Sequence, residues 1–228
     1  MLYDMNFNLY LIRHGESEVN VKPDEMGQTA DVKLTENGKN QAKLLGQYFN
    51  KKEIAFDKIF SSPYERAMRT AKIVTKNINK DNCFSSIEYA PELREYDAGN
   101  WTGASRKATM TPEVLNKMNI LNQTFLPPNG ESMNQVEKRA SKWLEDSILY
   151  NEDMWELCDF HHKINDRKVN IFAFSHGMTI KTLLHYIMGF DRNFTWKISI
   201  LNTSVTKLHF GKNGWALDYI NNTSHLND

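Results

Sequence analysis

The sequence is poor in cysteine, with only Cys83 and Cys158 among its 228 residues. The two cysteines lie far apart and form no CxxC pair, so the chain lacks the spacing of a disulfide-stapled domain or a structural zinc site. We therefore expect reduced thiols, no metal ion and no cofactor. His161 and His162 are adjacent, but their polar surroundings are more typical of a loop than of a metal site.

The chain also lacks an excess of charge of either sign. It has 28 Lys and Arg against 28 Asp and Glu, which gives a net charge of zero. This balance argues against the large basic surface that binds nucleic acid. No apolar run approaches the roughly 20 residues that span a bilayer, and the first 15 residues do not resemble a signal peptide. We predict a cytoplasmic protein with neither nucleic-acid nor membrane partners.

Short apolar runs alternate with helical patterns along most of the chain. Strands are predicted at 8–12, 56–62, 86–89 and from 169, and helices at 34–49, 62–74, 131–149 and 177–189. We expect the second helix to begin with Ser62 as its N-cap and Pro63 at its first position. A hairpin with a turn at 211–214 closes the chain. This order is typical of an α/β protein, a sandwich around a largely parallel central sheet.

We expect a single domain over 1–228. Two stretches, 104–129 and 150–167, are predicted to be variable, cap-like segments, and the first is expected to form one or two short helices followed by a turn. Loops over a rigid α/β framework are where recognition usually varies. Substrate specificity is therefore expected to depend on these two segments.

Charged and imidazole side chains follow two of the predicted strands. In "LIRHGESEVN", Arg13 and His14 come directly after an apolar run, and in "FSHG" His176 follows a late strand. The carboxyl ends of parallel strands meet at one edge of the sheet, where ligands of such folds bind. The two histidines should therefore lie together if their strands run parallel.

These residues suit a phosphate group. The planar guanidinium groups of Arg13 and Arg66 each match two phosphate oxygens, and the amides at the helix start beside His176, including that of Gly177, favour an anion. A neutral His14 could attack phosphorus and form a phosphohistidine. Its other ring nitrogen would then donate to a backbone carbonyl, which the flexible Gly15 can offer.

A proton for the leaving group must come from a nearby acid. The acidic cluster in "PELREYD" contains Glu92, Glu95 and Asp97, and a carboxyl group can act as acid in one half-reaction and as base in the other. Spacing alone leaves the choice among the three open.

The sequence as a whole resembles the histidine phosphatase superfamily, the phosphoglycerate-mutase-like fold. The resemblance rests on "LIRHGESEVN", "SSPYERAMRTA", "LREYDAGNWTG", "GES" and "FSHG", in this order. It implies a three-layer α/β/α sandwich, a metal-independent reaction and a phosphorylated histidine, which is His14 by position. Arg13, Arg66 and His176 match the phosphate pocket, Asn20 matches a phosphate-contacting asparagine, and the L-x-E pattern selects Glu95 as the acid.

Three segments depart from the sugar-phosphate mutases of this superfamily. They read "VKPDEMGQTAD", "REYDAGNWTG" and "SHGMT", and they carry little sign of a second phosphate site. The preferred interpretation is therefore a phosphomonoester hydrolase acting on a small phosphorylated metabolite or a phosphoprotein. A mutase-type phosphotransferase and a non-catalytic module that binds phosphorylated ligands are the alternatives. "LREYDAG" also resembles the acid segment of fructose bisphosphatases, which does not by itself identify a substrate.

Overall fold

The computed structural model describes residues 5–22, 24–27, 29–78, 86–159, 168–191 and 194–227. Its centre is a sheet of six strands in the order β3-β2-β4-β1-β5-β6. The strands are β1 (Phe7–Arg13), β2 (Lys58–Ser61), β3 (Ile87–Tyr89), β4 (Val169–Ser175), β5 (Val205–Gly211) and β6 (Gly214–Asn222). The first four pair in parallel, whereas β5 runs antiparallel to both β1 and β6. The predicted, largely parallel sheet and its terminal hairpin are confirmed.

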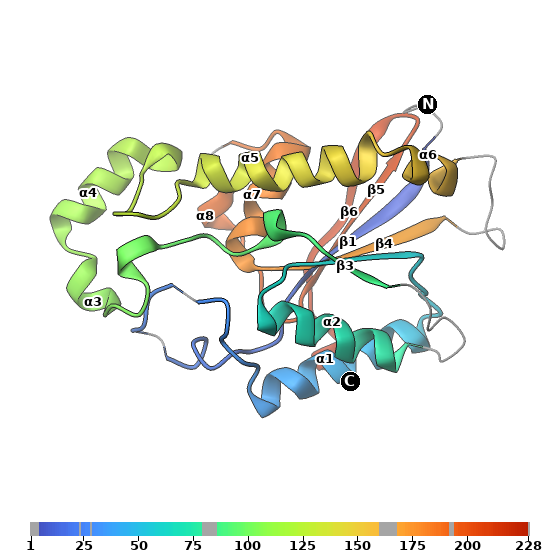
Figure 1. Cartoon of the computed structure of the whole chain (residues 1–228), viewed down its shortest axis with the longest axis horizontal. Coiled ribbons are helices and arrows are strands. Elements are labelled where there is room, and N and C mark those ends of the chain that lie inside the picture. The colour runs from blue at the N-terminus through green and yellow to red at the C-terminus, as the bar shows by residue number, and fades with distance from the viewer. Residues whose placement is uncertain are drawn as a thin grey trace.

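Helices cover both faces of this sheet (Figure 1). One face carries α1 (Glu36–Lys51) and α2 (Glu65–Asn77). The other carries α5 (Met133–Leu144), α6 (Glu152–Cys158) and α7 (Gly177–Met188). The short helices α3 (Arg106–Thr109), α4 (Pro112–Leu121) and α8 (Phe194–Lys197) complete the set. This is the predicted α/β/α sandwich.

The two apolar layers follow from alternation along the central strands. In β1, Phe7 and Leu9 pack against the α5 and α7 side, while Tyr10 and Ile12 pack against the α1 and α2 side. Successive side chains of a strand point to opposite faces, so a strand buried on both sides reads as a continuous apolar run. The same holds for β4, in which every residue is buried.

The predicted start of the second helix is wrong. Tyr64, not Ser62, is the N-cap residue, and α2 begins at Glu65. Ser62 directly follows β2, and its amide donates to the carbonyl of Phe174 in β4. Its hydroxyl lies 2.8 Å from His176 Nε2 and accepts from the amide of Tyr64, which is not part of the helix.

Two further segments differ in detail from the predictions. The long helix stays α-helical to Leu144 and then widens into a π-helical turn, Glu145–Leu149, before α6 begins within the variable segment 150–167.

Cys158 is a buried free thiol, and burial raises its pKa to about 12. Cys83, His161 and His162 lie outside the described residues. In the described part of the chain, no helix is long and apolar enough to cross a membrane.

Candidate active site

The two predicted histidines lie at the carboxyl ends of neighbouring parallel strands. β1 and β4 pair with Arg13 opposite Ser175, so His14 and His176 follow at the same edge of the sheet. Their ring centroids are 5.1 Å apart, and both side chains are fully buried. Strand pairing thus brings two distant sequence motifs into one site.

His14 is held in one orientation through its backbone neighbours. Its Nδ1 lies 2.7 Å from the carbonyl oxygen of Gly15, as the sequence predicted, and its Nε2 has no hydrogen-bond partner among the described residues. A Cβ at position 15 would lie 2.5 Å from the Gly38 carbonyl oxygen, so this close approach requires glycine. Burial lowers the pKa of His14 well below its usual value, and Arg13 and Arg66 lower it further. The imidazole is therefore neutral, with an available lone pair on Nε2.

Arg13 and Arg66 each have one anchored nitrogen. Arg13 Nη1 donates to the Ile200 carbonyl at 2.6 Å, and Arg66 Nη1 donates to the Thr29 carbonyl at 2.8 Å. Arg13 Nε and Arg66 Nε and Nη2 are buried without partners in the described part of the chain. Burial lowers the pKa of Arg66 to about 10, which leaves it charged at neutral pH. Buried, unpaired N–H groups on fixed cations are suited to an anion with several oxygens.

His176 completes the same cluster. Its Nε2 faces the Ser62 hydroxyl, while its Nδ1 has no partner among the described groups. Burial lowers its pKa well below the usual value, and the charge of Arg66 adds to this effect. The next residue, Gly177, opens α7, and a Cβ there would lie 3.7 Å from Arg13 Nε. The positive end of the α7 dipole therefore lies beside the arginine.

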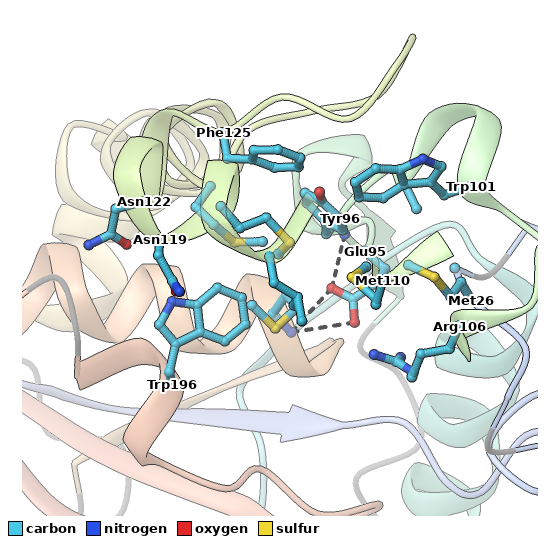
Figure 2. Close-up of a pocket in the computed structure, with 16 residues that line it drawn as sticks. Met26, Glu95, Tyr96, Trp101, Arg106, Met110, Asn119, Asn122, Phe125 and Trp196 are labelled. Atoms are coloured by element: carbon cyan, nitrogen blue, oxygen red, sulfur yellow. Dashed lines mark hydrogen bonds between the residues drawn. The ribbon is translucent and has the colours of Figure 1, made fainter. Parts of the chain in front are cut away.

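Glu95 lies across the start of α7. Its carboxylate accepts hydrogen bonds from the amides of Tyr96 (2.9 Å), Met178 (3.2 Å) and Thr179 (3.3 Å), and Figure 2 draws the first two. Its charge also acts on Arg13 and Arg66. Glu95 therefore belongs to the same electrostatic unit as the cations.

Glu92 is placed differently. It belongs to the 3-10 turn Pro91–Leu93, and its charge acts on Lys142 on the outer side of α5. Of these two glutamates, it is Glu95, the one that the family resemblance selects, whose carboxylate lies against the start of α7.

The sequence interpretation missed an arginine that holds the loop containing Glu92 and Glu95. Arg139 of α5 donates to the backbone carbonyls of Glu92, Arg94 and Glu95 and pairs with the carboxylate of Glu131 at 2.9 Å. The side chains of Arg139 and Glu131 are only 11% and 14% exposed. Burial raises the pKa of Glu131, but the hydrogen bond with Arg139, the charges of Arg139 and Arg94 and the hydrogen bond from the Asp97 amide together lower it overall.

Asn20 supports the loop around His14. Its Oδ1 accepts from the Ser17 amide and, at 3.0 Å, from Asn202 Nδ2. Asn202 Nδ2 also lies 3.2 Å from the His14 carbonyl oxygen, which accepts a second bond from the Thr203 amide. No sequence pattern singled out Asn202, because its role depends only on where the chain returns after α8.

A cavity of about 450 Å³ opens beside Glu95. It is formed by the segment between β1 and α1, the loop after β3, helices α3, α4 and α8, and the starts of α5 and α7 (Figure 2). The predicted variable segment 104–129 supplies Met110, Met118 and Phe125 to its lining. Among the described residues, no group of three or more His, Cys, Asp or Glu side chains could hold a metal ion.

Comparisons with known proteins agree with this geometry. Residues 9–223 match the model of the histidine phosphatase superfamily (branch 1). The broad-specificity phosphatase YOR283W of Saccharomyces cerevisiae is 28% identical over 222 residues, covering 96% of this chain and 87% of that protein.

Solved structures show the same architecture. A mutant phosphoserine phosphatase of Entamoeba histolytica, in complex with phosphoserine, superposes with a TM-score of 0.75 at 26% identity, covering 96% and 99% of the two chains. A phosphoglycerate mutase of Bacillus anthracis shares the fold at 23% identity, with a TM-score of 0.74 and coverage of 99% and 97%.

Proposed function

The chain belongs to the histidine phosphatase superfamily (branch 1), and on this premise we propose that it hydrolyses phosphomonoesters through a phosphohistidine at His14. One observation carries the proposal. The unpaired Nε2 of His14 shares a buried cluster with unpaired nitrogens of Arg13, Arg66 and His176 in the described structure. A nucleophile and several donors converge where one phosphate group would fit.

In the first half-reaction, His14 Nε2 attacks phosphorus and the bond to the ester oxygen breaks. Arg13, Arg66 and His176 stabilise the charge on the equatorial oxygens, an effect that is strong in a buried, preorganised site. The Gly15 carbonyl holds the proton on Nδ1, so that Nε2 keeps its lone pair. Glu95 donates a proton to the departing alkoxide.

In the second half-reaction, water attacks the phosphohistidine. Glu95, now ionised, takes a proton from this water, and the bond between His14 Nε2 and phosphorus breaks. Inorganic phosphate leaves and the starting protonation state returns. The reaction needs no electron acceptor and no further reactant besides water.

Hydrolysis is better supported than phosphoryl transfer between positions of a sugar acid. A mutase must bind a second phosphate away from the nucleophile, which calls for more cationic groups. In the described lining of the cavity, Arg106 is the one cation. The likeness to the Bacillus anthracis mutase extends to the fold alone.

A labelling experiment tests the proposal. Brief reaction with a ³²P-labelled phosphomonoester should leave label on the protein that is stable to base and labile to acid, followed by release of phosphate. A binding module would retain ligand without label, and a mutase would interconvert 2- and 3-phosphoglycerate faster than it releases phosphate. Activity should survive exhaustive chelation; loss on chelation that a divalent ion restores would contradict the metal-independent route.

A further inference from the structure

The cavity beside Glu95 is the place where the alcohol part of a substrate would lie. Glu95 and Met178 both line it, and the Met178 amide donates to the Glu95 carboxylate. A phosphate among Arg13, Arg66 and His14 would direct its ester oxygen toward Glu95, and the rest of the molecule would extend into the cavity. Its volume, about 450 Å³, falls within the range of small-molecule sites.

The lining is unusually apolar for a site that handles a charged group. Of the sixteen described residues that form it, only Glu95 and Arg106 carry a charge. Trp101 and Phe125 stack with their ring centroids 5.6 Å apart. The remaining apolar lining includes Met110, Leu115, Met118 and Trp196. Aromatic rings and flexible thioethers pack well against a ring or a branched alkyl group.

The same lining offers little to a small, charged metabolite. The alcohol part of phosphoserine carries an ammonium and a carboxylate, and each would lose its hydration on entering the cavity. Glu95 is committed to the proton transfer, and no other described lining residue carries a negative charge that could form an ion pair with the ammonium. Arg106 would be left for the carboxylate, but its charge already interacts with Asp24.

We propose that the preferred substrates are phosphate monoesters of alcohols that carry an aromatic ring, rather than phosphate esters of small amino or hydroxy acids. This inference rests on the proposed hydrolysis at His14 and specifies its substrate class. The phosphate supplies the charge that the buried cations bind. The ring supplies apolar surface to the cavity walls.

A series of primary phosphate esters tests the inference, because their leaving groups differ little in acidity. We expect kcat/KM for 2-phenylethyl phosphate to exceed that for ethyl phosphate by about 10–100-fold, the effect of burying one aromatic side chain. It should exceed the values for phosphoserine and 3-phosphoglycerate as well. Equal values within threefold, or a preference for either acid, would overturn the inference.

A binding measurement separates this inference from the proposed reaction. 2-Phenylethylphosphonate and ethylphosphonate cannot be hydrolysed, and titration calorimetry should show tighter binding of the first by a similar factor. If no ester labels or turns over but this binding preference holds, the hydrolase proposal fails and the cavity assignment stands. If turnover occurs without any preference, the cavity assignment alone fails.

Two matched variants on α4 locate the effect. Leu115 lines the cavity and is 46% exposed, whereas Ile120, 71% exposed on the same helix, does not line it. Leu115→Asn should reduce the ratio of kcat/KM for phenylethyl over ethyl phosphate by about 3–10-fold, as expected from making part of an apolar wall polar. Ile120→Asn should leave the ratio within twofold.

Since α4 contains no buried residue, neither change should unfold the protein, and melting temperatures check this. Equal effects of the two variants would contradict the assignment.

Discussion

The residues around His14 and the residues of α4 are built into the molecule in different ways. His14, Arg66 and His176 have no exposed surface and lie at or near the ends of central strands. The α4 helix has no buried residue and lies at the edge of the molecule, away from the sheet (Figure 1). Both regions nevertheless belong to one candidate active site, because the cavity reaches from α4 to Glu95.

This difference separates reaction chemistry from recognition. Stabilising charge that develops on phosphorus requires donors that do not reorient during the reaction, and burial against the sheet holds them. Recognising an alcohol requires only a wall of suitable shape and polarity. A wall on an exposed helix can change its side chains at little cost to the core. Mutations at the two regions should therefore affect different observables.

The largest effect is expected at the nucleophile. His14→Ala should abolish the acid-labile phosphoprotein and lower turnover by about 10⁴-fold or more, as loss of a catalytic nucleophile does elsewhere. Rapid-quench labelling measures this directly. His209→Ala, which removes a histidine at the surface that pairs with Asp218, is the control. It should change neither the labelling nor the turnover. Equal label in the wild type and His14→Ala would remove the nucleophile assignment.

The next effect should depend on the leaving group. Glu95→Gln keeps the shape of the side chain but cannot donate a proton. It should slow phosphoenzyme formation from alkyl phosphates by about 10²-fold or more, and that from p-nitrophenyl phosphate far less, because nitrophenolate leaves without a proton. Single-turnover rates are needed, since in the proposed mechanism the same carboxyl group acts again in dephosphorylation.

Glu92→Gln is the matched control for this measurement, because Glu92 lies on the same loop and its charge acts on Lys142. It should change both rates little. If Glu92→Gln shows the leaving-group dependence and Glu95→Gln does not, the acid is misassigned. If neither does, Asp97 or a residue of 104–129 must supply the proton.

A third change tests the ion pair between Glu131 and Arg139, the arginine of α5 that holds the loop carrying Glu95. Glu131→Gln should lower the free energy of unfolding by about 3 kcal/mol at pH 7, because it breaks a nearly buried ion pair with Arg139. The pKa of Glu131 is lowered in the folded protein, so its stabilising contribution is present above the ordinary value of 4.5 and is lost as pH falls below it. Urea unfolding at several pH values checks both statements. A difference that stays constant from pH 7 to pH 4 would contradict the ionic role.

The smallest effect is expected at Asn202. Removing its amide leaves the His14 carbonyl with the Thr203 bond alone, so Asn202→Ala should lower kcat by about 10-fold through misplacement of His14, with KM little changed. Asn202→Asp has the same shape but no amide donor. It should be as damaging as alanine if the hydrogen bond matters, and harmless if the side chain only fills space.

Much of the fold could be predicted from the chain because its causes are local. Alternating apolar residues in β1 and β4 require burial on both faces of a sheet, and strands separated by helices favour parallel pairing. The helix cap at Ser62 was predicted wrongly for the converse reason. Ser62 contacts Phe174 and His176, both far away in sequence, and α2 begins only at Glu65.

The sequence by itself singled out His14, His176, Arg13 and Arg66 as the candidate phosphate site, and Gly15 as the turn that would orient His14, because each residue lies beside the boundary of a strand or helix whose type is set by its own neighbours. Spacing alone left Glu92, Glu95 and Asp97 open, and the family resemblance favoured Glu95; the tertiary structure adds the physical reason, because the Glu95 carboxylate reaches the amides at the start of α7. Asn202, Arg139 and the apolar cavity likewise arise from segments far apart in the chain. Their contacts depend on how the helices pack onto the sheet, and spacing along the sequence carries no record of that packing.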